Sequence, residues 1–320
     1  MELRLSSFEI RALVEEASKE LEKSRLDKVQ QIDKELFRFS FSTKSGKKDL
    51  LVEIGKRLNL TGYNLKAPEK PSQLSILLRK HLENKRLEAI VQHEFDRVVV
   101  LDFSEYKLIL EFFSNGNMLL IDDKGKIILT FRHEEWKDRK LDRGETYLFP
   151  KGGLNPYAIG YGEFKEIFAE KDAVRSLAKS LSFGGDYAEE ICLLAGVDKN
   201  KEPSEKEKEA LFRAMEKMLK FGTEPVMQDN RLFPFPLSRY PVQKKYGSMN
   251  EAVDEFYLTK PESQKLKKLR KRLEEQTKAM DRFEREAQEA AKKGDFIYSH
   301  YQDIEKVLGK KKGKFTLELD

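Results

Sequence analysis

The sequence contains a single cysteine, Cys192, and only four histidines among its 320 residues. One cysteine excludes a disulfide framework and favours a reducing compartment. No histidine has metal-ligand spacing to another histidine or to Cys192. We therefore expect no metal site and no cofactor, and we expect Cys192, which lies in an apolar stretch, to be a core thiol.

Motifs for phosphate loops and nucleophiles are also missing. The sequence holds no G-x-x-x-x-G-K-[ST], no G-x-G-x-x-G and no G-x-S-x-G. We find no signal peptide and no apolar run long enough to span a bilayer. These absences predict a cytoplasmic protein without membrane contact, and they give no sign of an enzyme.

Charge, by contrast, is abundant. Charged residues make up 37% of the chain, and 61 Lys and Arg against 56 Asp and Glu give a formal net charge of +5. The segment 260–320 holds 17 basic and 12 acidic residues, so the excess lies there. Such an excess can contact polyanions, and it is also typical of a solvated helix.

The first 170 residues contain many short apolar strands and two predicted helices. Ser6 and Glu9 have capping-box spacing at the start of one helix. A second helix is predicted over Pro71–Leu82, whose leucines share one face. Strands are predicted over 27–32, 36–41, 49–54, 87–92, 97–103, 107–113, 117–121 and 126–131. This pattern indicates an α+β domain, residues 1–170, with a largely antiparallel sheet.

After the breaker cluster Gly152–Pro156 the periodicity becomes helical. Helices are predicted over 161–168, 173–180, 186–194, 204–219 and 248–256. Between two of them, Gly184 and Gly185 form a tight hairpin that resembles a helix-hairpin-helix, whose amide groups can receive a phosphate. Asp186 is expected to be the N-cap of the following helix, and its charge would oppose an anion. An ordinary turn between helices is the favoured alternative.

One long charged helix is predicted from Pro261 to about Lys293, with Gly294 as its break and a second helix over 296–308. Its apolar residues follow coiled-coil spacing: Leu266, Leu269, Leu273, Met280, Phe283 and Ala287. The predicted organisation is thus an α+β domain over 1–170, a helix-hairpin-helix domain over 171–225, a return segment over 226–259, and the start of a coiled-coil arm over 260–320. Self-association through this arm is possible.

A charged pair precedes the apolar run Val98–Leu101. Asp96 and Arg97 lie at the mouth of a predicted buried strand. Two such charges are costly to desolvate without partners. Either they pair with each other and with neighbours, or they are held ready for a ligand; the residues alone favour the private ion pair.

Three further residues are candidates for polar contacts. Arg79 and Lys80 are expected on the polar side of their helix, where contact with phosphate competes with simple solvation. Glu9 has a sufficient explanation in the capping box.

Several segments together resemble the NFACT family of NEMF- and RqcH-like ribosome-associated quality control factors, formerly described as fibronectin-binding protein A-like. The strongest is Pro71–Leu82, followed by Gln92–Val98. Others are Ser6–Val14, Arg25–Gln31 (with Gln30 where the family usually has Tyr), Ser114–Asp122, Arg143–Pro150 and Lys293–Tyr301. Each segment is weak alone, but in this order they are specific and cover nearly the whole chain.

The resemblance implies an N-terminal domain related in fold to the Fpg/MutM glycosylases, a helix-hairpin-helix domain and a coiled-coil arm. It implies a factor that binds large ribosomal subunits carrying stalled peptidyl-tRNA, and that recruits tRNA for untemplated C-terminal tailing of the stalled chain. The chemistry would be ribosomal. The Asp96–Arg97 pair and Glu9 match positions implicated in engaging tRNA, although the family usually has Asp where this chain has Glu9.

Two alternatives stay open. A nucleic-acid lyase or glycosylase on the related fold would use an amine, but the N-terminal Pro-Glu of those enzymes is replaced by Glu2-Leu3. A surface adhesin would require export. The chain also lacks the family's RNA-binding and C-terminal domains, and we expect it to be the N-terminal half with a shortened arm.

Overall fold

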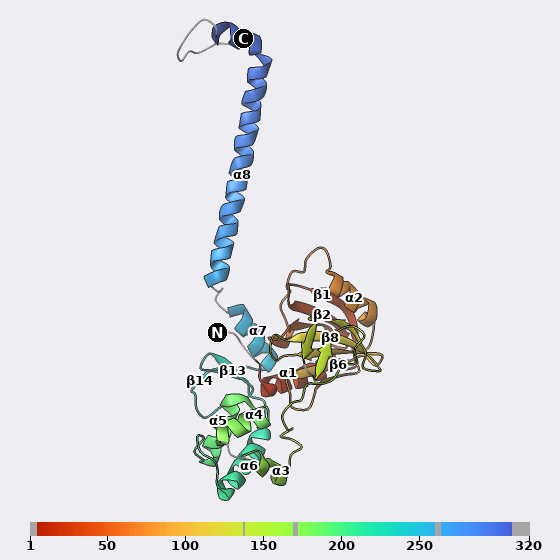
Figure 1. Ribbon diagram of the computed structural model, residues 1–320, viewed down its shortest axis with the longest axis vertical. Coiled ribbons are helices and arrows are strands. Elements are labelled where there is room, and N and C mark those ends of the chain that lie inside the picture. Colours follow the sequence, from red (N-terminus) through yellow and green to blue (C-terminus); the bar gives the residue numbers. More distant parts are fainter. Residues whose placement is uncertain (1–4, 137, 169–171, 260–263, 309–320) are drawn as a thin grey trace. The chain divides into compact units, whose positions relative to one another are not determined.

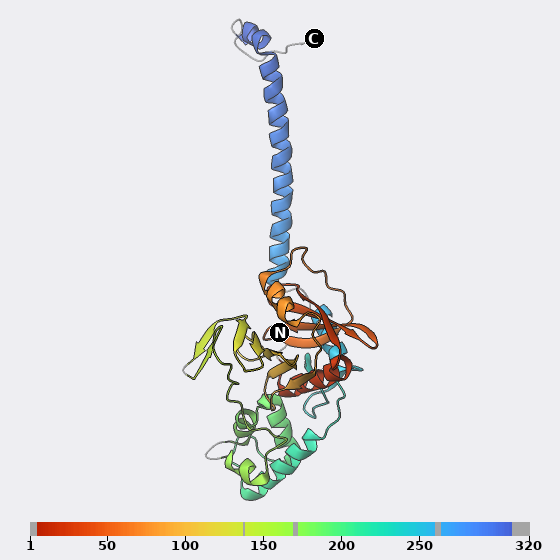
Figure 2. The same cartoon turned by 90° about the vertical axis from the view of Figure 1, so that its right-hand side faces the viewer.

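The computed structural model describes residues 5–136, 138–168, 172–259 and 264–308. Backbone contacts divide the chain into two compact units, Met1–Thr259 and Lys260–Asp320. The first unit contains the sheets and a group of short helices, and the second contains a long helix (Figures 1 and 2).

Two antiparallel sheets follow one another along the chain. After α1 (Ser7–Leu21), the first sheet has the order β1-β2-β3-β4, and α2 (Gln73–Leu82) precedes the second, which has the order β5-β6-β7-β8-β9. Their bounds are β1 Arg25–Gln31, β2 Leu36–Thr43, β3 Gly46–Glu53, β4 Arg57–Thr61, β5 Ala89–Gln92, β6 Val98–Asp102, β7 Tyr106–Glu111, β8 Asn117–Asp122 and β9 Ile127–Thr130. A small hairpin, β10 (Glu134–Trp136) and β11 (Arg139–Leu141), follows.

The main core lies around α1 and the inner faces of both sheets. Ile10, Leu13 and Ala17 of α1 recur at helical spacing and are fully buried. They belong to the same apolar cluster as Phe37 and Phe39 of β2. Fully burying one such side chain contributes about 1.5–3 kcal/mol, so this contact positions α1 firmly.

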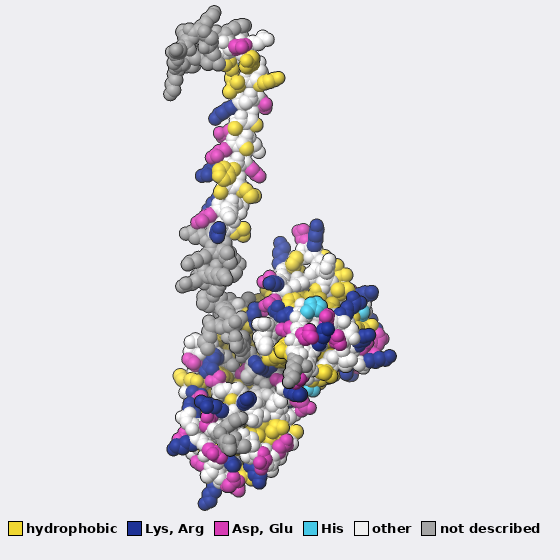
Figure 3. Space-filling model, viewed as in Figure 1, with side chains coloured by type: hydrophobic (Ala, Val, Ile, Leu, Met, Phe, Trp, Pro, Cys, Tyr) yellow, Lys and Arg dark blue, Asp and Glu magenta, His cyan; other side chains and the backbone are white. Residues whose placement is uncertain are grey.

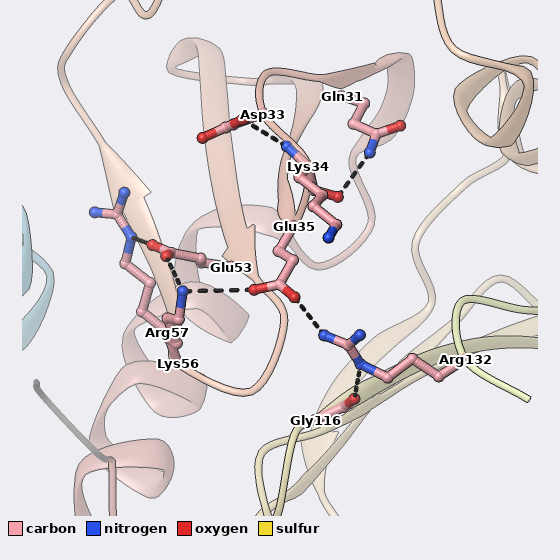
Figure 4. Close-up of polar contacts among 9 residues, drawn as sticks. All are labelled: Gln31, Asp33, Lys34, Glu35, Glu53, Lys56, Arg57, Gly116 and Arg132. Atoms are coloured by element: carbon pink, nitrogen blue, oxygen red, sulfur yellow. Dashed lines mark hydrogen bonds and ion pairs between the residues drawn. The ribbon is translucent and has the colours of Figure 1, made fainter. Parts of the chain in front are cut away.

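The two sheets are also joined by an ionic network (Figure 4). Glu35, between β1 and β2, accepts from Arg132, which follows β9, and also from Lys56 at 3.5 Å. The Nε of Arg132 donates to the carbonyl of Gly116 at 3.0 Å. The arginine hydrogen bond lowers the pKa of Glu35 below its ordinary value.

The helices that follow form a second core. They are α3 (Tyr161–Glu166), α4 (Ala173–Ser180), α5 (Gly184–Ala195) and α6 (Glu205–Leu219). Phe8 of α1 and Phe95 of the β5–β6 turn are buried in this core among Phe183 and Tyr187. Two aromatic rings from the sheet part therefore anchor the helical part.

The chain then returns to α1. A three-stranded sheet with the order β13-β12-β14 is formed by β12 (Val226–Gln228), β13 (Arg231–Phe233) and β14 (Val242–Lys245). Helix α7 (Met249–Thr259) follows, and Glu16 of α1 accepts from the backbone N–H groups of Met249 at 2.7 Å and Asn250 at 2.9 Å. A carboxylate there stabilises the helix N-terminus.

The second unit consists of α8 (Gln264–Ser299) and α9 (Tyr301–Leu308). Leu273, Met280 and Phe283 of α8 are exposed. The predicted start at Pro261 and the segment 309–320 lie outside the described residues, as do Met1–Arg4 and the predicted domain boundary near 170.

The predicted α+β class with antiparallel sheets is confirmed, but several local predictions are wrong. Strands β4, β10, β11, β12 and β14 were not predicted, because strands of three to five residues are too short to show a clear periodicity and are recognised through their partners. Gly294 lies inside α8, where one glycine costs only about 1 kcal/mol. Asp186 is not an N-cap: α5 begins at Gly184, and Asp186 lies in its first turn.

Candidate functional site

The turn between β5 and β6 carries the predicted pair. His93 and Val98 close it, since the N–H of His93 donates to the carbonyl of Val98 at 2.8 Å. Phe95 points into the helical core and is 2% exposed. Asp96 and Arg97 follow it directly and are half-buried, so the anchored phenylalanine presents the pair at the surface.

The pair does not form a private salt bridge. One Asp96 carboxylate oxygen, Oδ1, accepts from the backbone N–H of Arg97 at 2.7 Å. Within the described parts of the chain, neither side chain has an ion-pair partner within 4.0 Å. The carboxylate therefore shapes the turn, and the guanidinium donors of Arg97 have no partner among the described residues.

The turn is tied to α1 and to the α4–α5 connection. The Gln92 amide donates to the carbonyls of Ser7 at 2.9 Å and Asp96 at 2.8 Å. The hydroxyl of Ser7 donates to the carbonyl of Ser182 at 3.2 Å. The start of α1 thus connects the charged pair to the predicted hairpin.

The segment 150–154 lies between the β5–β6 turn and the α4–α5 connection. Leu154 donates its N–H to the carbonyl of Ser180 at 2.7 Å, and Gly153 donates to the hydroxyl of Ser182 at 3.3 Å. A Cβ at Gly152 would lie 2.8 Å from Oδ2 of Asp96. The glycines of the breaker cluster therefore allow the chain to pass close to the pair.

Together these elements line an open cleft of about 880 Å³. Its basic side chains are Arg97, Lys151 and Lys179, and its acidic ones are Asp96, Glu163 and Glu166. The remaining lining comes from Phe113, Ser114, Pro150, Gly152, Gly153, Leu154, Ile167, Ser180 and Ser182. Lys151 pairs with Asp138 at 3.6 Å, whereas Arg97 and Lys179 have no ion-pair partner among the described residues. Cations beside an aromatic ring and hydroxyl groups suit a ligand with phosphates and flat bases.

Glu9 is not in the cleft. It is 4% exposed, accepts from the backbone N–H of Ser6 at 2.6 Å in the predicted capping box, and accepts from the hydroxyl of Tyr187 on α5. Burial raises its pKa, against the opposing effect of these hydrogen bonds. The buried Glu9 joins α1 to α5 through Tyr187, and its contact with tRNA stays a prediction.

Arg79 and Lys80 lie elsewhere, on α2. Lys80 is exposed, and the Nε of Arg79 donates to the carbonyl of Val29 at 2.6 Å. Neither residue lines the cleft of the charged pair. The predicted contact residues are thus divided between two places on the first unit.

Gly184 and Gly185 are exposed at the start of α5, and Gly184 has a φ of +74°. Asp186 beside them accepts from Nη1 of Arg231 at 2.6 Å, which offsets its charge. The two glycines do not line the cleft, whereas Ser180 and Ser182 of the same connection do.

The sequence reasoning missed the lysines of the cleft. Lys151 and Lys179 come from segments far from Arg97 in the sequence, and no motif marks them. In the sequence the glycine cluster at Gly152 predicts only a boundary, whereas in the structure it allows the backbone to pass close to Asp96.

Among the described residues, no group of three or more His, Cys, Asp or Glu side chains is placed to hold a metal ion. No helix in the described ranges has both the length and the apolar character needed to cross a bilayer.

Known proteins resemble this chain along most of its length. The family described as NFACT N-terminal and middle domains matches residues 6–309. The archaeal Rqc2 homolog aRqcH of Methanocaldococcus jannaschii is 33% identical over 96% of this chain and 52% of its own length. The Rqc2 homolog RqcH of Streptococcus pneumoniae is 25% identical over 83% of this chain and 50% of its own. The chain therefore spans about half the length of these relatives.

Solved structures agree on the fold. The N-terminal part of the fibronectin/fibrinogen-binding protein from Streptococcus suis has a TM-score of 0.69 at 22% identity, covering 80% of this chain and all of that one. The fibrinogen-binding protein from Staphylococcus aureus has a TM-score of 0.65, also at 22% identity, covering 79% and 98%. At this identity the likeness concerns the fold alone. The matched residues and the relatives together show that the chain belongs to the NFACT family and comprises its N-terminal and middle domains.

Proposed function

We propose that this chain is a tRNA-binding factor of ribosome-associated quality control. It would bind large ribosomal subunits that carry stalled peptidyl-tRNA, in the cytoplasm, and recruit tRNA for untemplated C-terminal tailing. Relatives named Rqc2 homologs support the ribosomal role. The observation that carries the tRNA contact is the Arg97 guanidinium, which lines an open cleft without an ion-pair partner among the described residues.

Arg97 would supply the strongest contact. A guanidinium offers a planar fork of donors that matches phosphate oxygens or a base edge. Asp96 would hold the turn through its bond to the Arg97 N–H, and its outer oxygen can accept from a ribose hydroxyl or a base amine. Peptide transfer would remain ribosomal chemistry, so the role of this chain is binding rather than catalysis.

The test is tRNA binding by Arg97→Ala, Asp96→Ala and the double variant at one salt concentration. We expect a loss of affinity of about tenfold or more for Arg97→Ala, since charged hydrogen bonds contribute about 1.5–3 kcal/mol. Arg213→Ala is the matched control, because Arg213 lies on α6, is 79% exposed and does not line the cleft. If the folded double variant binds tRNA as tightly as the control, the site assignment fails.

No observation favours the two alternatives. A lyase that used an amine would form a borohydride-trappable adduct with abasic DNA, so that assay separates it from a binding factor. The proteins described as fibronectin- or fibrinogen-binding are 22% identical to this chain, and that likeness extends to the fold and not to a ligand.

The long helix α8 would serve as an arm. Leu273, Met280 and Phe283 are exposed and follow coiled-coil spacing, which supports pairing with another helix or a second copy of the chain. Sedimentation of the protein over a range of concentrations tests self-association, and Met280→Glu with Phe283→Glu should abolish any dimer. A monomer at all concentrations would remove self-association from the proposal.

A further inference from the structure

A second hollow, of about 200 Å³, opens between β1, the segment 67–71 and α2. Three basic side chains line it: Lys28 of β1, Lys70 just before α2, and Arg79 of α2. One carboxylate, that of Glu69, also lines it. Across the described ranges, none of the three cations has an ion-pair partner within 4.0 Å. Uncompensated positive charge around a hollow attracts anions.

Two of the side chains that line this hollow, Arg79 and Gln30, are held in place by contacts behind it. The Nε of Arg79 is fixed on the carbonyl of Val29, which leaves its two Nη groups available. The Oε1 of Gln30 accepts from Nη2 of Arg38 at 2.7 Å, so the Gln30 amide nitrogen faces a different direction. That nitrogen has no acceptor among the described residues, and Gln30 lines the hollow. The side chains of Arg79 and Gln30 therefore lose less conformational entropy when they bind an anion.

The hollow and the Arg97 cleft occupy different parts of the first unit. Helix α2 lies at one end and helices α3 and α4 at the other in both views (Figures 1 and 2). On the face shown in Figure 3, Lys and Arg side chains lie among Asp and Glu side chains at both ends. A ligand that reaches both places must be extended.

We propose that Lys28, Lys70 and Arg79 form a phosphate-binding pocket for the backbone of RNA, separate from the Arg97 cleft. The inference rests on the proposed function for the identity of the partner. The pocket has no aromatic side chain in its lining, so it would hold phosphodiester groups without reading bases. The RNA is either tRNA or ribosomal RNA, and both present the same phosphate chemistry.

The experiment uses the Lys28→Ala, Lys70→Ala double variant of the full chain. Affinity for purified tRNA and for purified large ribosomal subunits is measured between 50 and 200 mM salt. Loss of two phosphate contacts should reduce the slope of log affinity against log salt by about 2 for one of the two probes. The probe whose slope falls identifies the RNA.

The matched control is Lys47→Ala, Lys124→Ala, which removes the same charge from two exposed lysines outside the pocket. All four lysines are exposed, so both double variants should keep the melting temperature of the parent protein. Unchanged slopes for both probes, or an equal fall in the control, would overturn the pocket. If Arg97→Ala loses tRNA binding while the pocket variant keeps its slopes for both tRNA and large ribosomal subunits, the proposed function stands and this inference falls. If the pocket variant shows a reduced slope while Arg97→Ala binds tRNA as tightly as the parent protein, the pocket is supported and the Arg97 assignment fails.

Discussion

Gly55 and Gly116 meet backbone to backbone where the two large sheets touch. A Cβ on Gly116 would lie 2.2 Å from both the Cα and the N of Gly55, and one on Gly55 would lie 2.7 Å from the carbonyl oxygen of Asn115. Both glycines have a φ near +72°, a backbone conformation that residues with a side chain rarely adopt. The contact lies beside the Glu35–Arg132 network, so backbone packing and charge join the sheets at the same place.

Gly116→Ala should therefore destabilise the first unit strongly. Left-handed strain costs about 1–2 kcal/mol and the forced backbone shift about 1–3 kcal/mol more. Urea unfolding measures the loss. Gly125→Ala is the control, because Gly125 has a φ of +79° but nothing within 4 Å of the added carbon. Equal losses in the two variants would show that the glycine contact does not hold the sheets together.

Glu9 should make stability depend on pH in a defined direction. Burial raises its pKa in the folded state above 4.5, so the folded protein binds this proton more tightly than the unfolded chain. The stabilisation is complete below the ordinary pKa and is lost as the pH rises through the folded value. Glu9→Gln should remove this decline, which is read from unfolding curves of both proteins between pH 4 and pH 8.

Glu9→Ala should behave differently from Glu9→Gln. It removes the capping box and leaves the Tyr187 hydroxyl without its acceptor, at a combined cost of about 2–4 kcal/mol. If alanine is tolerated as well as glutamine in thermal unfolding, Glu9 does not join α1 to α5 as described.

Gly152→Ala should disturb the charged pair rather than the fold. The added Cβ would press against the carboxylate of Asp96, which can turn away because it is the end of a side chain. We expect weaker tRNA binding with little change in the melting temperature. Gly162→Ala, with open space at its Cβ, is the control. An unaltered tRNA affinity for Gly152→Ala would show that the position of Asp96 does not matter for binding.

Arg132→Leu should destabilise the protein in a way that depends on acid. Arg132 lowers the pKa of Glu35, so the stabilisation is present above pH 4.5 and is lost as the pH falls through the folded value. The pair is partly exposed, and we expect a cost of about 1–2 kcal/mol at pH 7. At pH 3 the cost should be smaller than at pH 7, and its lower limit is the cost of losing the bond to Gly116. A cost that is equal at both pH values in urea unfolding would exclude the ion pair as its source.

The sequence by itself determined the features that depend on neighbours along the chain. Apolar periodicity located α1, α2 and most strands of the two large sheets, and Ser6 and Glu9 marked a true capping box. Motifs in their order indicated the family that the comparisons confirmed.

The tertiary structure decided everything that depends on contacts between distant residues. The spacing of Asp96 and Arg97 favoured a private ion pair, whereas the fold leaves Arg97 beside Lys151 and Lys179 in one cleft. In the folded protein Glu9 is buried beside Tyr187, and Arg79 lines a different pocket. Burial and ion pairing depend on long-range packing, which here brings together one sheet, one turn and one helix end. A local sequence pattern does not predict which residues come into contact at such a place.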